Sequence, residues 1–236
     1  MAGRVDLRVR RARVVSTLAA VALAVSAAAA DRPRLVPVQA DDKAKQLGAG
    51  KILVARRSLA DPNFAETVVL LVQYDEDGTL GLIINRQTKV PVSRLWKEIQ
   101  AARGRTEPLY VGGPVATSGL MALLRTGIKP DEAQHVFADV YMISSKTAVE
   151  KAVGSSADAK TLRLYMGYAG WDGGQLEWEM GMDAWDVLPA KSGIVFDPHP
   201  ETLWSRLVEQ EGMQMAGLRP ERLLFWRLPW SLHAAD

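Results

Sequence analysis

The pattern that most limits how this chain can fold is a pair of apolar segments joined by an acidic turn. Residues 67–74 and 79–85 are rich in β-branched and apolar side chains, and the sequence Asp-Glu-Asp-Gly at residues 75–78 separates them. Asp-Gly between two such runs is a strong signal for a tight β-hairpin. Because the first run is almost continuously apolar, we expect other elements to cover both of its faces.

Shorter elements surround this hairpin without a regular strand–helix–strand rhythm. Apolar runs predict strands at residues 51–56, 109–111, 120–125, 135–143, 162–166 and 184–188. Apolar spacing and starting residues predict helices at 92–103, 146–153 (capped by Ser145), 175–180 and 200–211. Such a mixture favours an α+β fold over a doubly wound parallel sheet.

The first thirty residues have the features of an export signal. Residues 4–13 contain five arginines, residues 14–30 are uncharged and apolar or small, and Ala28 and Ala30 offer cleavage points. We therefore expect a signal peptide at 1–30, a linker at 31–50 and an exported protein, periplasmic or secreted. The alternatives are an uncleaved anchor, an organellar presequence, or a start assigned too far upstream in a cytoplasmic protein.

Charge argues against a nucleic-acid partner. The whole chain carries a net charge of +2 and its first thirty residues carry +4, so residues 31–236 carry −2. A nucleic-acid-binding protein normally displaces phosphate counterions with a basic face, and no dense basic run occurs after residue 30. The absence of cysteine excludes disulfides, thiolate catalysis and cysteine metal ligands.

The sequence also points away from catalysis. The three histidines, His135, His199 and His233, lack the spacing of a metal site. No Gly-x-Ser-x-Gly motif supplies a serine nucleophile. The acids at 75–77 lie at a solvated hairpin tip, where the shifted pKa of a general acid is not expected. We expect no catalytic residue, no metal and no cofactor.

A glycine-rich segment is the strongest candidate for a binding site. Residues 167–177 combine a predicted loop at 167–174 with the start of the predicted helix at 175–180. They contain Gly170, Trp171, Asp172, Gly173, Gly174 and Gln175. A loop that ends at a helix start can present backbone N–H groups to an anion. The simpler alternative is that Asp172 caps the helix and that the glycines allow close packing around Trp171.

Asn85 and Arg86, at the end of the hairpin, form a second candidate. A buried Arg86 can pair with a carboxylate such as Asp61 or Glu177 and so hold the sheet to the glycine-rich segment. It can equally bind an acidic ligand, because a guanidinium suits both kinds of carboxylate.

Tryptophan is abundant in this chain, with seven residues. We expect four of them to pack in the core, namely Trp171, Trp178, Trp185 and Trp204. Trp226 and Trp230 lie in the C-terminal tail, where they suit contact with a membrane interface or with a partner. The alternative for this tail is that it folds back over an apolar face of the domain.

Several long motifs occur in a fixed order along the chain. They are residues 52–55 (ILVA), 61–64 (DPNF), 67–71 (TVVLL), 81–86 (GLIINR), 110–115 (YVGGPV), 167–171 (GYAGW), 174–177 (GQLE) and 184–185 (AW), followed by Phe196, Asp197 and Trp204. This order resembles the AlgH/YqgE family of bacterial proteins. The resemblance defines a domain at 51–236 and is strongest over residues 51–212.

The resemblance implies a compact α+β fold, in which a mixed sheet curls into a barrel-like core with flanking helices. It implies no established enzymatic activity, and some members carry the label of putative transcriptional regulators. The chain departs from the family pattern at residues 73–74, where many members have Glu-His, and near residues 123–124, where a histidine is missing. It departs again at residues 172–174, where Gly-Pro-Gly is common.

Three functional hypotheses follow. The first is a non-catalytic ligand- or protein-binding module of the cell envelope, which fits the leader and the charge of −2 after it. The second is a cytoplasmic regulatory protein, as the family label suggests. The third is an enzyme whose site lies in the segment 167–177. We take the first as the main hypothesis, and the sequence leaves its ligand or partner unspecified.

Overall fold

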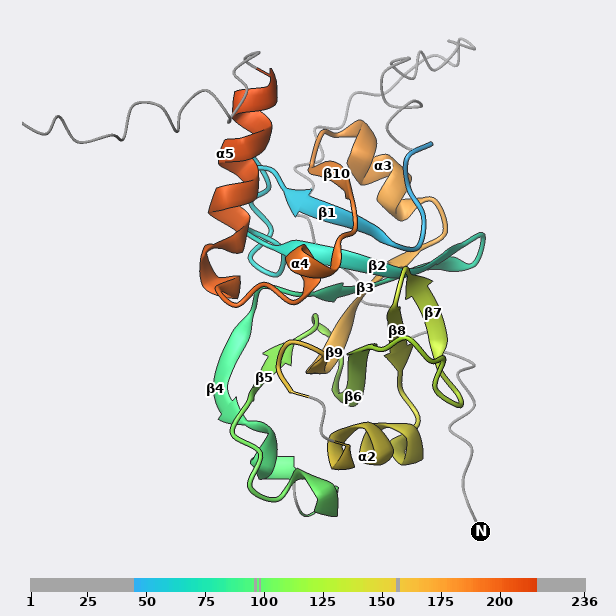
Figure 1. The fold of residues 1–236 in the computed structure, drawn as a ribbon. Helices are drawn as coiled ribbons and strands as arrows, with labels where there is room; N and C mark the ends of the chain where they lie inside the picture. The colour runs from blue at the N-terminus through green and yellow to red at the C-terminus, as the bar shows by residue number, and fades with distance from the viewer. Residues whose placement is uncertain (1–44, 96, 98, 156–157, 216–236) are drawn as a thin grey trace, which may run out of the picture.

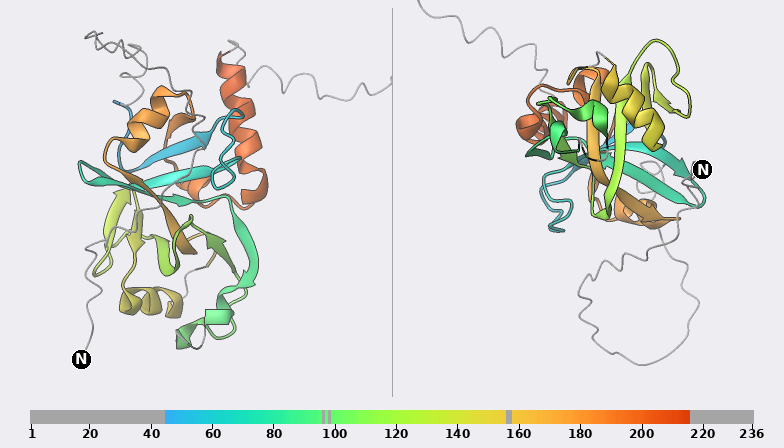
Figure 2. Two further views of the ribbon diagram at one scale, coloured as in Figure 1. Left: turned by 180° about the vertical axis from the view of Figure 1, so that it is seen from behind. Right: turned by 90° about the horizontal axis from the view of Figure 1, so that it is seen from below.

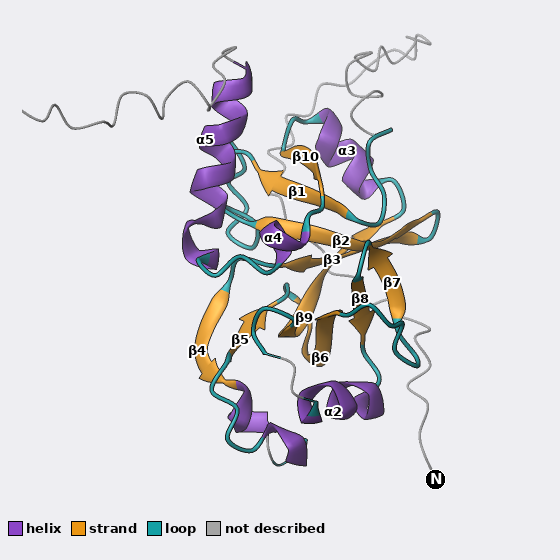
Figure 3. Ribbon diagram, viewed as in Figure 1, coloured by secondary structure: helices purple, strands orange, loops and turns teal. Residues whose placement is uncertain are grey.

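The computed structural model describes residues 45–215, apart from residues 96, 98, 156 and 157. The predicted signal peptide, most of the predicted linker, Trp226, Trp230 and His233 lie outside the described residues. Figure 1 shows a curled sheet with helices around it, and Figure 3 distinguishes strands from helices by colour.

Within the described residues, ten strands form the sheet. They are β1 (Lys51–Ala55), β2 (Val68–Asp75), β3 (Gly78–Ile83), β4 (Gln87–Pro91), β5 (Pro108–Val111), β6 (Val115–Arg125), β7 (Gln134–Phe137), β8 (Val140–Ile143), β9 (Leu162–Asp172) and β10 (Trp185–Pro189). Eight follow the order β10-β1-β2-β3-β9-β6-β8-β7, and β4 and β5 join through β9. The β5–β9 pair is parallel and the other pairs between described strands are antiparallel. This mixed sheet curls into a half-barrel, which confirms the predicted fold class.

The predicted hairpin is confirmed as β2 and β3, with a bulge after Leu71. Residues 68–72 are fully buried. Alternate side chains of a strand point to opposite faces of the sheet. Accordingly, Val68 and Leu70 pack in one apolar cluster, and Val69 and Leu71 pack in another. The continuous apolar run therefore reflects a sheet that has a core on each face.

The long strand β9 joins the two halves of the sheet. Its earlier residues pair with β5 and β6, and residues 169–172 pair with β3. The loop predicted at 167–174 is therefore wrong, because strand pairing continues through these residues as far as Asp172. The chain just after β5 passes very close to β9. A Cβ at Gly113 would lie 2.1 Å from the carbonyl carbon of Tyr168, so this crossing requires glycine.

Helices flank the half-barrel. They are α2 (Lys146–Gly154), α3 (Gln175–Gly181), α4 (Ser192–Val195) and α5 (Leu203–Met215), with short 3-10 helices η1 (Val92–Leu95), η2 (Gln100–Ala102) and η3 (Pro200–Thr202). Figures 1 and 2 show α3 and α5 at the end that contains β1 and β10, and α2 at the opposite end. As predicted, Ser145 caps α2, because its Oγ accepts the backbone N–H of Ala148. No helix in the described part of the chain is long and apolar enough to cross a membrane.

Two further predicted elements are wrong. The described part of residues 92–103 contains the 3-10 helices η1 and η2 instead of one α-helix, and the backbone N–H groups of Val92 and Ser93 donate to the carbonyls of Glu107 and Arg105. Residues 135–143 form two antiparallel strands, β7 and β8, instead of one. The chain reverses between them at Ala138, whose φ of +43° is left-handed.

Residues 45–50, which end the predicted linker, already contact the domain. Leu47 packs against the apolar cluster beneath α3. The backbone N–H of Gly50 donates to the carbonyl of Leu71, and the carbonyl of Gly50 accepts the N–H of Ala190. Packing of the domain therefore starts shortly before β1.

Candidate functional site

The glycine-rich candidate is the end of a strand followed by a tight turn. Gly170 and Trp171 lie in β9, opposite Leu80 and Thr79 of β3. Gly173 and Gly174 then lead into α3, and Gly174 occupies the N-cap with a left-handed φ of +79°. The helix has no side-chain cap.

Asp172 does not cap α3, contrary to the sequence-based alternative. Its backbone is still paired with Gly78 in the sheet, so its side chain is not at the N-cap. The backbone N–H of Asp172 instead donates to Oε1 of Gln175 at 3.2 Å. Binding of an anion at this turn stays a prediction.

Trp171 belongs to a cluster that we name the tryptophan cluster, which consists of Phe64, Trp171, Trp185 and Glu179. The ring of Phe64 stacks on Trp171 with centroids 5.6 Å apart and meets Trp185 edge-on at 5.7 Å. Oε2 of Glu179 accepts both indole N–H groups, at 3.0 and 2.9 Å, and Oε1 accepts the side-chain amide of Gln175 at 3.1 Å. Every polar side chain of the cluster therefore has a partner.

Asn85 anchors the loop that carries Phe64. Its Oδ1 accepts the backbone N–H of Val68 at 2.8 Å, and its Nδ2 donates to the carbonyl of Glu66 at 2.9 Å. The side-chain amide thus joins the end of the hairpin to the chain just before β2.

Arg86 holds the same loop through backbone carbonyls. Its guanidinium donates to Asn63 at 2.7 Å and to Pro62 and Ala65 at 3.3 Å. Arg86 makes no hydrogen bond to the carboxylate of Asp61 or Glu177, because turn carbonyls accept from its donors. Burial lowers the pKa of Arg86, and the nearby charge of Asp61 acts in the opposite direction.

The sequence candidates are thus connected through one loop. Asn85 and Arg86 fix residues 62–66, and Phe64 in that loop packs on Trp171. These contacts place the candidates within one structural unit, in which their polar groups are used to hold the loop.

The outer face of α3 carries exposed apolar side chains. Trp178 and Met182 are 57% and 66% exposed, so the expected core position of Trp178 is wrong. Leu176 and Met180 face the sheet and are buried; since Trp178 lies two residues from each, it points away from the core. Its neighbour Glu177 faces the hairpin.

The tip of the β2–β3 hairpin lies beside this helix. The hydroxyl of Tyr74 donates to Oε1 of Glu177 at 2.6 Å, and this bond raises the pKa of Tyr74 to about 12. A Cβ at Gly173 would lie 2.6 Å from the carbonyl oxygen of Glu76. We name the resulting region the α3 surface; it comprises Trp178, Met182, Asp75, Glu76, Asp77 and Asp172.

A second polar cluster lies at the start of β9, and we name it the arginine cluster: Arg163, Tyr165, Tyr110 and Phe196. Arg163 is only 5% exposed. Its guanidinium lies 4.9 Å from the ring centre of Tyr110 and 5.7 Å from that of Phe196. Its Nη1 donates to the carbonyl of Val195 at 2.9 Å, and its Nη2 donates to the carbonyl of Asp197.

Two buried polar atoms of the arginine cluster have no hydrogen-bond partner, namely Nε of Arg163 and the hydroxyl of Tyr165. Tyr165 is fully buried, and its ring lies 5.4 Å from that of Tyr110. Burial raises the pKa of Tyr165, although the charge of Arg163 and the contact of the Arg163 side chain with the hydroxyl oppose this effect. The hydroxyl therefore stays protonated in the folded protein.

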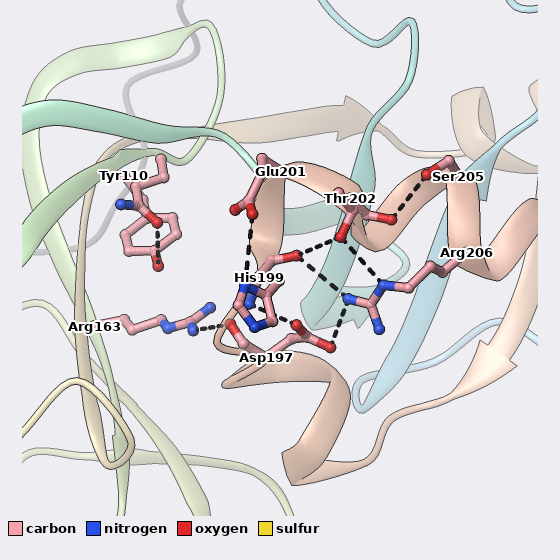
Figure 4. A network of polar contacts seen from close by, with 9 residues as sticks. Tyr110, Arg163, Asp197, His199, Glu201, Thr202, Ser205 and Arg206 are labelled. Carbon is pink, nitrogen blue, oxygen red and sulfur yellow. Dashed lines mark hydrogen bonds and ion pairs between the residues drawn. The ribbon is translucent and has the colours of Figure 1, made fainter.

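The carboxylate next to Arg163 belongs to another ion pair. Figure 4 shows Arg163 and Arg206 approaching Asp197 from opposite sides. Arg206 pairs with Oδ2 of Asp197 at 2.8 Å, while Oδ1 accepts the backbone N–H of His199 at 2.8 Å. Arg163 therefore contacts Asp197 only through its backbone carbonyl.

The sequence analysis missed the arginine cluster, although one signal was present. Arg163 stands between Leu162 and Leu164 in a predicted strand. A single charged residue inside an apolar strand points either to solvent or to a buried polar site, and nothing in the sequence distinguishes these outcomes.

Outside the two clusters, we searched the described residues for a metal site and for a hollow. In the described part of the chain, no group of three or more His, Asp or Glu residues has the geometry to hold a metal ion. An open hollow of about 240 Å³ lies beside α5 and is lined by Arg56, Arg57, Leu59, Ala65, Glu66 and Trp204. The guanidinium of Arg57 lies over the Trp204 ring at 5.4 Å, and Arg56 pairs with Asp183 and Asp186.

The sequence of this chain is similar to those of known bacterial proteins. The sequence profile described as AlgH-like matches residues 52–216. A UPF0301 protein of Streptomyces avermitilis is 36% identical over 176 residues, which cover 71% of this chain and 88% of the relative. A UPF0301 protein of Azoarcus sp. (strain BH72) is 34% identical over 170 residues, which cover 70% of this chain and 90% of the relative.

Solved structures have a similar fold. The solution structure of the AlgH protein from Pseudomonas aeruginosa matches with a TM-score of 0.56 and 26% identity, and the match covers 88% of this chain and 100% of the other. The crystal structure of protein DIP2367 from Corynebacterium diphtheriae matches with a TM-score of 0.60 and 24% identity. This match covers 70% of this chain and 87% of the other. At this identity the second likeness concerns the fold alone.

Proposed function

Because this chain belongs to the AlgH-like family, whose relatives named above carry labels that specify no reaction, we propose that it is a non-catalytic binding protein. Its α3 surface receives a protein partner that presents cationic and apolar side chains. The observation that carries this proposal is the exposure of Trp178 and Met182 on α3, whose first turn lies against an acidic hairpin tip.

The apolar part of the surface has the composition of a binding hot spot. Tryptophan is enriched among residues that dominate binding energy, and methionine adapts to irregular partner surfaces. Met182 is the C-cap of α3 and lies four residues after Trp178, so the two side chains lie on the same side of the helix. Together they offer a partner one continuous apolar contact.

The acidic part of the surface selects the charge of the partner. Among the described residues, Asp75, Glu76, Asp77 and Asp172 take part in no ion pair. A positive partner therefore gains attraction here without first breaking an internal salt bridge, and complementary charge speeds association.

The surface is also held in place before a partner arrives. The bond from Tyr74 to Glu177 ties α3 to the hairpin, and the two indoles bonded to Glu179 tie it to the sheet. Because little ordering remains to be done on binding, a smaller part of the contact energy is lost to entropy.

A defined peptide pair tests this surface. We expect an amphipathic Lys/Leu peptide to shift the amide NMR signals of α3 and of the hairpin tip, and its Glu/Leu counterpart to leave them unchanged. Trp178→Ser should weaken binding by about tenfold or more. The matched control Ile128→Ser removes an apolar side chain that is 81% exposed in the connection between β6 and β7. Equal affinity of both variants would overturn the proposal.

We place this protein in the cell envelope, and the support is the sequence of its first thirty residues. The test is the mass of the untagged native protein after cell fractionation. A chain that begins near residue 31 and is found outside the cytoplasm supports export. A chain in the soluble cytoplasm that retains its N-terminus, or starts at a later codon, contradicts it and favours the cytoplasmic regulator.

A further inference from the structure

The open hollow beside α5 is lined by side chains of opposite charge next to apolar surface. Its volume is about 240 Å³; Arg57 and Glu66 contribute charges, and the apolar surface comes from Leu59, Ala65 and Trp204. At about 30 Å³ for each water molecule, this volume corresponds to about eight waters. The hollow therefore suits a small molecule better than a long segment of a partner chain.

Two charges in the hollow are available to a ligand, those of Arg57 and Glu66. Neither takes part in an ion pair among the described residues, and the guanidinium of Arg57 lies over the ring of Trp204 at 5.4 Å. Arg56, which also lines the hollow, is already paired with two aspartates. A cation and an anion that share one hollow without pairing with each other can each pair with a ligand.

The wall that carries Glu66 is held by the two candidate residues at the end of the hairpin. Nδ2 of Asn85 donates to the carbonyl of Glu66 at 2.9 Å, and Nη2 of Arg86 donates to the carbonyl of Ala65 at 3.3 Å. Glu66 has a left-handed φ of +58°, which is uncommon for a residue with a Cβ. Such backbone strain persists where the surrounding structure enforces it, and it is concentrated at binding sites.

The wall that carries Trp204 is fixed as well. The indole N–H of Trp204 donates to the carbonyl of Ala55, at the end of β1, at 2.7 Å. The backbone N–H of Leu59 donates to the carbonyl of Arg56 at 2.9 Å, which turns the chain between these two residues. Both walls are thus formed before a ligand arrives, so little loss of conformational freedom opposes binding.

We propose that this hollow binds a free α-amino acid with an apolar side chain, such as leucine. The carboxylate pairs with Arg57, the ammonium group pairs with Glu66, and the side chain contacts Leu59 and the ring of Trp204. A ligand with only a carboxylate would meet a like charge at Glu66, and one with only an ammonium group would meet a like charge at Arg57, so the two residues together select a zwitterion. This site is separate from the α3 surface and does not depend on the function proposed for that surface.

The test follows the backbone amide and indole N–H signals of the full chain by ¹⁵N NMR. Near neutral pH and at constant ionic strength, leucine is titrated beside glycine, which lacks the apolar side chain, N-acetylleucine, which lacks the ammonium group, and leucinamide, which lacks the carboxylate. We expect leucine to shift the signals of Leu59, Glu66 and the Trp204 indole saturably, and each matched compound to bind at least about threefold more weakly. No saturable shift with leucine, or an equal affinity for any of the matched compounds, would overturn the proposal.

Neutral substitutions at the two charges separate binding from folding, because both side chains are exposed. Arg57→Gln and Glu66→Gln should each weaken the binding of leucine by about three- to fivefold. The matched controls are Arg103→Gln, at an exposed arginine at the end of η2, and Glu132→Gln, at an exposed glutamate with a left-handed φ of +56°. The assignment fails if the controls weaken leucine as much as the two test variants do, or if the test variants bind leucine as tightly as the native chain.

Discussion

The strand β9 carries a polar cluster near each of its ends, and the two differ in how their buried groups are satisfied. In the tryptophan cluster, one carboxylate accepts both indole N–H groups and a side-chain amide. In the arginine cluster, the charged group bonds only to carbonyls, and two donors remain without acceptors. The conspicuous motif thus lies where hydrogen bonding is complete, and the incomplete cluster lies at a position that no motif marks.

This difference indicates where substitutions should reduce stability most. A polar network that is fully satisfied rigidifies a core, whereas a partly satisfied one costs free energy unless something else completes it. We therefore expect substitutions in the tryptophan cluster to reduce stability more than substitutions in the arginine cluster.

The largest effect should come from Glu179→Leu. This change leaves the indole N–H groups of Trp171 and Trp185 without acceptors, and we expect it to lower the free energy of unfolding by about 3 kcal/mol. Glu179→Gln retains an acceptor and should cost about 1 kcal/mol. Urea unfolding measures both, and equal losses for the two variants would show that the bonds to the indoles contribute little.

Arg163→Met should cost less, about 1–2 kcal/mol. The carbonyls of Val195 and Asp197 lose their donors, but the substitution also removes a charge whose burial is unfavourable. The same urea experiment gives the comparison. A loss greater than that of Glu179→Leu would indicate that the charge of Arg163 is better compensated than the contacts suggest, and the contrast between the clusters would fail.

Alkaline pH should affect the tryptophan-cluster end through Tyr74. Its pKa in the folded protein is raised from 10.0 to about 12 by the bond to Glu177. A group whose folded pKa is raised contributes stability below its unfolded pKa, so this contribution is present below pH 10 and disappears as the pH rises to about 12.

Phenolate absorbance measures this titration. Glu177→Gln should return the pKa of Tyr74 toward its ordinary value, because the acceptor charge is removed. Tyr165, which is buried, should ionise only when the chain unfolds. Titration of Tyr165 in the intact fold would contradict its burial, and the description of the arginine cluster would then be wrong.

The smallest effect should come from Tyr165→Phe. The hydroxyl makes no hydrogen bond in this structure, so its removal should change the free energy of unfolding by less than about 1 kcal/mol, in the stabilising direction or not at all. A large destabilisation would mean that the hydroxyl has a partner, and the two clusters would then be alike.

Much of the fold is visible in the sequence because local signals and tertiary contacts agree there. The Asp-Gly turn and the apolar runs around it predict β2 and β3, and Ser145 predicts the start of α2. The segment 167–174 is misleading because its glycines indicate a loop, while distant pairing with β3 and β6 makes it a strand. Local glycine signals carry no information about such partners.

The candidate site is less predictable for the same reason. The sequence identifies Asn85, Arg86 and Trp171 as a group of interest, and the structure connects them through the loop that carries Phe64. The bonds that Arg86 makes to turn carbonyls depend on the shape of that loop. The environment of Arg163 is set by the carbonyls of Val195 and Asp197, about thirty residues further along the chain, and local sequence does not indicate this contact.

The position of β9 in the sheet sets the order in which the protein can be completed during synthesis. β3 has its second neighbour in β9, so one edge of the β2–β3 hairpin stays unpaired until residues 162–172 have been made. An exposed apolar strand edge invites pairing with other chains, and nascent chains in this state depend on protection. Under the proposed export, the same delay has a benefit: closure of the sheet awaits a late segment, so the chain stays unfolded for longer while it crosses a membrane.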